Sequence, residues 1–154
     1  MTASSWRYTI NYENRDTLGI YKSANSSPSS VNNDYGPGPY LMGAETLIGN
    51  KVYNKQAEDL GDIKEIMLDM RHGHVSYAVL EFGGFLGMGT KLFAVPWDAL
   101  TLDTAEKRFV LDANKESLKN APGFEKDQWP DMADSGWEKS IHDYYGTVPY
   151  SRPV

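Results

Sequence analysis

Two histidines separated by one glycine are the residues of this chain that most suggest chemistry. His72 and His74 have the i, i+2 spacing that places two side chains on one face of a strand, where neutral imidazoles can bind zinc. Asp69 or the distant His142 would have to complete the ligand set. The same residues also fit a tight hairpin turn, because Gly73 readily adopts a positive φ. We favour the turn, so His72 and His74 stay weak candidates and no metal is predicted.

A glycine-rich loop, residues 83–89, lies between two apolar segments and invites comparison with phosphate-binding loops. It lacks the Gly-Lys-Ser/Thr ending of such a loop, and it leads into another apolar segment rather than a helix. We therefore interpret its glycines as a tight bend. Three apolar side chains project from it: Phe85, Leu86 and Met88. The sequence leaves open whether they are buried under the C-terminal tail or form a contact surface for another subunit.

Other residues suited to catalysis are few. The chain has no cysteine, which excludes disulfides, thiolate nucleophiles and cysteine-bound zinc. Carboxylates are abundant, but sequence spacing assigns none of them to an acid–base pair. They include Glu58, Asp59, Asp62, Glu65 and Asp69. We therefore predict no catalytic residue, no cofactor and no enzymatic activity.

The chain is acidic, with a formal net charge of -6 over 154 residues. No basic patch emerges that would neutralise nucleic-acid phosphates, so nucleic acid is not an expected partner. No apolar run approaches the ~20 residues needed to span a bilayer, so no transmembrane segment is expected. The first residues lack the basic start and apolar centre of a secretory signal. We expect a cytoplasmic protein if Met1 is the native start, and an earlier removed leader stays an open alternative.

The elements that must position these residues are mostly strands. Apolar residues recur in short segments at regular spacing, which is typical of a small barrel or sandwich. The predicted strands cover residues 46–53, 62–70, 75–82, 91–97, 99–102 and 108–111. The strand at 75–82 is apolar on both faces, so we expect it to be central. In the strand at 62–70, alternation places Ile66, Leu68 and Met70 on one face. The predicted fold class is all-β.

Two short helices are predicted after the strands. The first covers about residues 115–120, with Asn114 as its N-cap. The second covers about residues 135–145, where Ser135 and Glu138 match a capping box and a glycine follows the last residue. The final residues of the chain should be extended.

Aromatic residues are concentrated in the C-terminal extension, residues 125–154. Three of them lie close to one face of the second predicted helix: Trp137, Tyr144 and Tyr145. The simpler interpretation is that this face packs back onto the strands. The alternative is an interface with another protein, where Trp and Tyr are favoured anchors.

The first segment, residues 1–40, is polar and differs from the rest of the chain. Its apolar side chains near the start are Trp6, Tyr8, Ile10 and Tyr12, which alternate with polar residues as in a half-buried strand. The residues that follow are rich in Ser, Asn, Gly and Pro. One interpretation is a disordered tail. The other is an arm whose strand, residues 6–12, pairs with a sheet edge of this chain or of a neighbouring subunit.

Several short motifs in the middle of the chain resemble, in order and spacing, the PRC-barrel domain, which is named for the H subunit of photosynthetic reaction centres. The matching residues are Gly49, Val52, Leu60-Gly61, Ile63, Tyr77-Ala-Val79, Gly83-Gly84, Ala94-Val-Pro-Trp97 and Glu116-Ser-Leu118. The resemblance implies a small, strongly bent β-barrel over residues 41–124. A short helix should follow its last strand, and the tail should be helical and extended.

The same resemblance implies a function. PRC-barrel relatives serve as assembly or docking modules without catalytic residues of their own, and the likeness is to stand-alone bacterial members. We therefore expect a non-enzymatic protein that contacts a protein partner or further copies of itself, as a homo-oligomer. An alternative, implied by the H subunit, is a small-ligand-binding or electron-transfer accessory protein. A third, an adapter in ribosome or RNA maturation, is disfavoured by the acidic charge.

Overall fold

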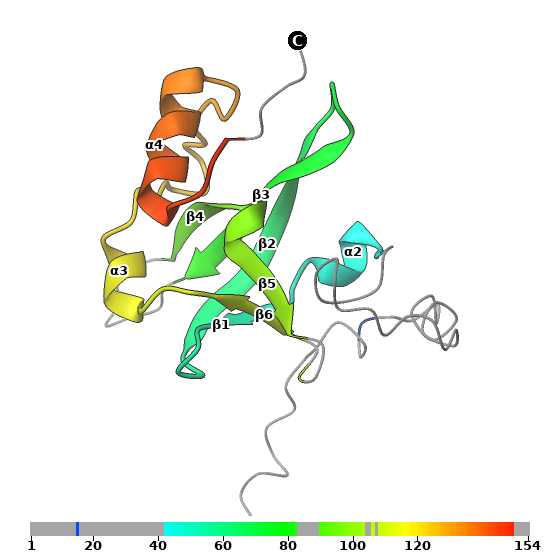
Figure 1. The fold of residues 1–154 in the computed structure, drawn as a ribbon, viewed down its shortest axis with the longest axis vertical. Helices are drawn as coiled ribbons and strands as arrows, with labels where there is room; N and C mark the ends of the chain where they lie inside the picture. Colours follow the sequence, from blue (N-terminus) through cyan, green and yellow to red (C-terminus); the bar gives the residue numbers. More distant parts are fainter. Residues whose placement is uncertain (1–14, 16–41, 83–89, 104–105, 107, 150–154) are drawn as a thin grey trace, which may run out of the picture.

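A computed structural model of the protein describes Arg15 and residues 42–82, 90–103, 106 and 108–149 (Figure 1). Within these residues the strands are β1 (Lys51–Tyr53), β2 (Asp59–Asp69), β3 (His74–Phe82), β4 (Lys91–Pro96), β5 (Leu100–Asp103) and β6 (Arg108–Leu111). The helical segments are α2 (Ala44–Leu47), the 3-10 turn η3 (Trp97–Ala99), α3 (Lys115–Lys119) and α4 (Ser135–Tyr145).

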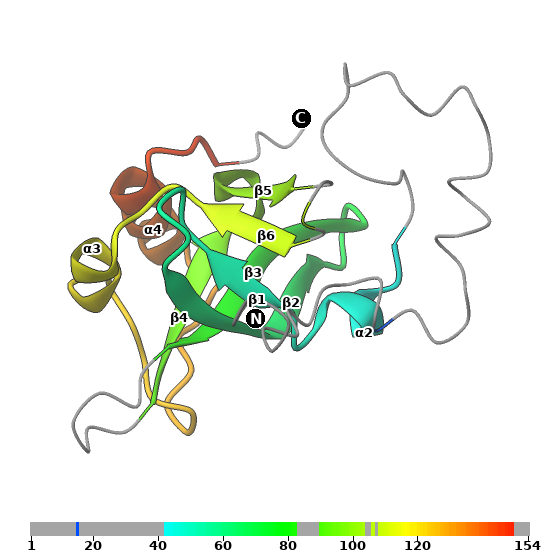
Figure 2. The ribbon, with the colours of Figure 1, turned by 90° about the horizontal axis from the view of Figure 1, so that it is seen from below.

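The six strands form one sheet in the order β4-β3-β2-β1-β6-β5. All neighbours are antiparallel except β1 and β6, which run parallel. The sheet curls into a half-barrel, as the view from below shows (Figure 2). This curled sheet confirms the prediction of an all-β, strongly bent barrel. The short helix predicted after its last strand is α3.

The concave side of the sheet holds the main hydrophobic core, to which all six strands contribute buried side chains. The rings of Phe82 and Phe93 meet edge to face with their centroids 6.3 Å apart. The Trp97 ring lies 5.8 Å from that of Phe109 and joins the two ends of the sheet. Because each such side chain contributes about 2 kcal/mol when buried, this core is the main source of stability.

β3 is an interior strand, as its apolar pattern predicted. It pairs with β2 on one side and β4 on the other. Ala78 and Leu80 face the main core, whereas Tyr77 faces a second cluster with Ala94 and Ile141. Since Ile141 belongs to α4, this helix covers the outer face of β3 and β4 (Figure 1).

The strand predicted for residues 46–53 is wrong over residues 46–50. The chain instead forms one turn of helix, α2, which buries Leu47. Gly49 then adopts a φ of 92°, which redirects the chain into β1. Its amide donates to the carbonyl of Ile63 (2.7 Å), so this bend is attached to β2. A short apolar run does not distinguish a buried helical turn from a strand.

The two later helices lie where they were predicted, with one correction. Asn114 caps α3, because its side-chain oxygen accepts from the amide of Ser117 (2.7 Å). The capping box assigned to Ser135 is wrong. Asp134 is the N-cap of α4 and accepts from the amide of Trp137 (2.9 Å). A carboxylate at this position also interacts favourably with the helix dipole, which the serine does not.

Two groups of predicted contact residues lie outside the described residues. They are Trp6, Tyr8, Ile10 and Tyr12 of the arm, and Phe85, Leu86 and Met88 of the glycine loop. Among the residues that are described, no helix combines the length and apolar character needed to cross a bilayer.

Candidate functional site

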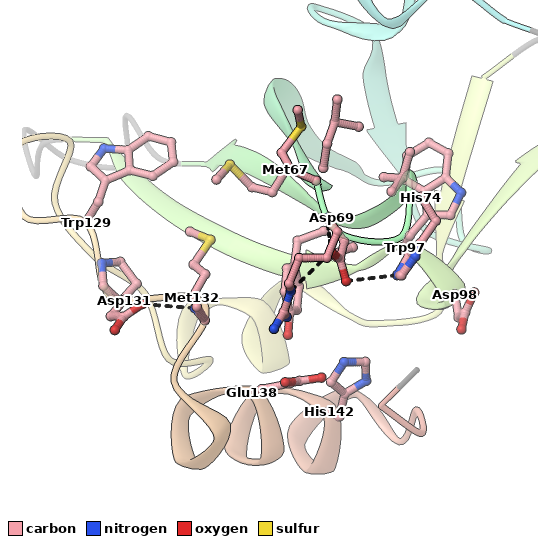
Figure 3. A pocket seen from close by; sticks show the side chains of 18 residues that line it. Met67, Asp69, His74, Trp97, Asp98, Trp129, Asp131, Met132, Glu138 and His142 are labelled. Atoms are coloured by element: carbon pink, nitrogen blue, oxygen red, sulfur yellow. Dashed lines mark hydrogen bonds and ion pairs between the residues drawn. The ribbon is translucent and has the colours of Figure 1, made fainter. Parts of the chain in front are cut away.

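The hairpin formed by β2 and β3 extends beyond the strands on either side of it (Figure 1). β1 pairs only with the first part of β2, and β4 pairs with β3 only from Tyr77 onward. Beneath the hairpin tip is a groove of about 790 Å³. We define this groove by the hairpin (residues 67–71 and 74–77), the start of η3 (97–98), the segment 129–133 and two side chains of α4 (Figure 3).

Apolar side chains form much of the groove wall. Leu68, Met70 and Trp129 are exposed by 53%, 85% and 42%, respectively. Only two other large apolar side chains of the described chain are comparably exposed. Met67 and Met132 lie in the same wall and are half-buried. Exposed apolar groups gathered on one concave surface are typical of a contact site.

The segment 129–133 is held in place by local bonds. The indole nitrogen of Trp129 donates to the carbonyl of Lys126 (2.8 Å), and its ring lies 5.1 Å from that of Phe124. Asp131 accepts from the amide of Ala133 (3.0 Å), which fixes the turn before α4. This wall of the groove is therefore formed in advance of any contact.

Three carboxylates around the groove carry charge that the described chain does not neutralise. Asp98, Asp131 and Glu138 line the groove and form no ion pair with any described residue. Glu138 lies on the side of α4 that faces the hairpin, next to His142 (Figure 3). Burial raises the pKa of Tyr77 to about 12, and the charge of Glu138 adds to this effect. The groove is therefore negative as well as apolar.

Asp69 organises the hairpin tip. Its carboxylate accepts from the amide of Arg71 (2.9 Å), and its other oxygen lies 3.1 Å from Nδ1 of His72 and 4.0 Å from Nε2 of His74. The hydrogen bond from His72 lowers the pKa of Asp69 to about 2, with the backbone amides adding to the effect. Gly73 has the positive φ of 69° that the turn requires.

The sequence model of the PRC-barrel domain matches residues 41–118, about half of the chain. The chain belongs to the PRC-barrel family. No curated protein matches it. The match includes α2, the six described strands and all but the last residue of α3, and it ends before the segment 129–133 and α4. The groove is therefore formed jointly by the PRC barrel and by a C-terminal extension that the family match does not include.

The metal hypothesis for the PRC-barrel hairpin rested on His72, His74 and a third ligand. The structure brings Asp69 to both histidines, while His142 bonds through Nδ1 to the hydroxyl of Thr147 (2.7 Å). Within the described ranges, no three histidine, aspartate or glutamate side chains are grouped so as to hold a metal ion. Asp69 instead accepts hydrogen bonds within the turn at the hairpin tip.

The three aromatic side chains of α4 differ in how far they are buried against the PRC barrel. Trp137 packs against Tyr77, with ring centroids 5.3 Å apart. Tyr145 packs against both apolar clusters, and its hydroxyl is buried. Tyr144 is exposed and donates from its hydroxyl to the carbonyl of Ser117. The helix face that was predicted to be apolar thus packs largely on the barrel.

Sequence reasoning missed two exposed groove residues of the hairpin, Leu68 and Met70. Alternation placed Leu68 on the same face as Ile66, but the ladder with β3 shifts register between Met67 and Leu68. Ile66 is consequently buried, while Leu68 is exposed. A bulge leaves no signature in the apolar pattern, so the exposed surface was not predictable from it.

Proposed function

We propose that this PRC-barrel protein is a non-enzymatic interaction module, and that its groove holds an apolar, positively charged segment of a protein partner. The observation that carries the proposal is the combination of exposed apolar side chains and unneutralised carboxylates on one concave surface. Relatives with a PRC barrel act as docking modules, which agrees with this role. No reactive constellation among the described residues favours an enzyme.

The apolar wall supplies the driving force for binding. Leu68, Met70 and Trp129 together expose apolar surface that a partner would remove from water, and each Å² buried contributes about 25 cal/mol. Methionine side chains such as Met67 and Met132 adapt their shape to different apolar partners. Trp129, held by its own hydrogen bond, is suited to act as a rigid anchor.

The carboxylates decide which partner fits. Asp98, Asp131 and Glu138 favour lysine or arginine in the bound segment, because opposite charges across an interface accelerate and orient association. A second copy of the chain, with the same net charge of -6, would be repelled. The groove therefore favours a basic protein partner over self-assembly.

Isothermal calorimetry with two synthetic peptides of equal length tests this proposal. One consists of leucine and lysine, the other of leucine and glutamate. We expect the lysine peptide to bind and the glutamate peptide not to bind. The double variant Asp98→Asn with Glu138→Gln should weaken binding of the lysine peptide about tenfold. Raising the salt concentration should also weaken it, since exposed charges are screened.

A matched control removes two carboxylates outside the groove. Glu45→Gln with Glu106→Gln changes the net charge by the same amount, and both side chains are exposed. We expect the affinity for the lysine peptide to stay within about twofold of the wild-type value. Equal affinity for both peptides, or equal weakening by the two double variants, would contradict the proposal.

A second candidate is a small-ligand-binding protein. The groove volume of about 790 Å³ falls within the range of small-molecule sites, roughly 300–1,000 Å³, and this observation favours the candidate. A thermal-shift panel of metabolites and quinones separates it from the first. A ligand that raises the melting temperature of the wild type, but not of a Trp129→Ala variant, would favour it.

A further inference from the structure

Among the described residues, no strand pairs with one edge of β2 over the half of the strand next to the hairpin tip. On the side away from β3, the ladder ends at Ile63, whose amide donates to Asn50 (2.9 Å) and whose carbonyl accepts from Gly49 (2.7 Å). From Lys64 to Asp69, no other strand of the described chain pairs with β2 on that side. An open strand edge is a template for another strand.

A backbone amide on this edge, that of Ile66, is hydrogen-bonded to a side chain. Its backbone amide donates to a side-chain oxygen of its neighbour Glu65 (3.0 Å) rather than to a carbonyl of another strand. Because Glu65 is exposed, water can solvate its carboxylate if a carbonyl of an added strand replaces it as the acceptor for Ile66. The backbone amide of Ile66 is therefore available to donate to a carbonyl of an added strand.

The Arg15 side chain contacts the bend beside the start of this edge. Its Nε donates to the carbonyl of Thr46 (3.1 Å). Its guanidinium lies within 3.0 Å of the position that a Cβ on Gly49 would occupy. Gly49 is in turn bonded to Ile63, the last paired residue before the open edge. Arg15 thus lies close to the point where the open edge begins.

We propose that residues 6–12 of the same chain add to β2 as a further strand, antiparallel to residues 64–69. Tyr12 lies three residues before Arg15, and three extended residues span about 10 Å. A seven-residue strand covers about 23 Å, close to the length of the open edge. The alternation of Trp6, Tyr8, Ile10 and Tyr12 with polar residues suits a strand with one covered face. This proposal does not depend on the function of the groove.

Amide hydrogen exchange of the full-length protein, followed by NMR, tests the proposal. Ile10→Pro removes a ladder donor from the arm, whereas Ser30→Pro makes the same kind of change outside the arm strand. We expect Ile10→Pro to accelerate exchange at Ile66 about tenfold and Ser30→Pro to leave it unchanged. Exchange at Leu80, between β2 and β4, reports that both variants are folded.

The proposal is overturned if Ile66 exchanges equally in the wild type and in both variants. A dilution series tests the assignment to the same chain. Strand addition within one chain predicts protection of Ile66 that is independent of protein concentration. Protection that is lost on dilution would mean that a second copy supplies the strand, which overturns the assignment to the same chain.

Discussion

Gly61 and Gly73 both adopt positive φ angles, 113° and 69°, but their surroundings differ. A Cβ on Gly61 would lie 2.2 Å from the carbonyl oxygen of Glu81, in the neighbouring strand β3. A Cβ on Gly73 would meet no atom within 4 Å. Gly61 therefore allows β2 and β3 to approach, whereas Gly73 serves only the turn.

Substitution of these two glycines by alanine should separate the two roles. We expect Gly61→Ala to lower the free energy of unfolding by about 3 kcal/mol or more, because strand separation adds to backbone strain. Gly73→Ala should cost about 1–2 kcal/mol from strain alone. Urea unfolding measures both, and equal losses would contradict the close contact at Gly61.

The Asp69 carboxyl gives a prediction about pH. Its pKa is lowered to about 2, chiefly by the hydrogen bond from His72. A depressed carboxyl pKa stabilises the folded state above the ordinary value of about 4, and this stability is lost as the pH falls toward 2. An NMR titration should show that His72→Ala raises the pKa of Asp69 toward 4. His74→Ala should raise it less, because His74 is 4.0 Å away.

At the scale of elements, the cap of α4 is open to a direct test. Asp134 accepts from the amide of Trp137, whereas Ser135 is the first residue of the helix. We expect Asp134→Ala to destabilise the protein by about 1 kcal/mol and Ser135→Ala to change stability by less than half as much. Thermal unfolding of the two variants measures the difference. A larger loss of stability for Ser135→Ala than for Asp134→Ala would contradict the assignment of Asp134 as the N-cap.

The sequence allowed most elements to be predicted, because their patterns are local. Alternating and continuous apolar runs indicated β2 to β6, and Asn114 indicated the start of α3. The short helix α2 was missed, since its single turn has no periodicity to detect. The groove was missed for another reason. It depends on the register shift at Met67 and on Trp129 lying opposite the hairpin, and neither is encoded in a local pattern.

At the scale of the whole molecule, the PRC barrel and the extension form one surface together. The hairpin comes from the matched residues 41–118, while Trp129, Met132 and Glu138 come from beyond them. Family membership predicted the barrel and its role as a module, but it contained no information about this joint groove. The groove, which we propose as the contact surface, therefore depends on the packing of α4 and of the segment before it.

Methionine methyl NMR tests the central claim that the groove is the contact surface. Met67, Met70 and Met132 line the groove, whereas Met42 packs against the main core near α2 and serves as an internal control. On addition of the leucine–lysine peptide, we predict that the methyl signals of Met67, Met70 and Met132 shift and that the signal of Met42 does not. Binding that leaves the three groove methyls unchanged, or that shifts Met42 equally, would contradict the account.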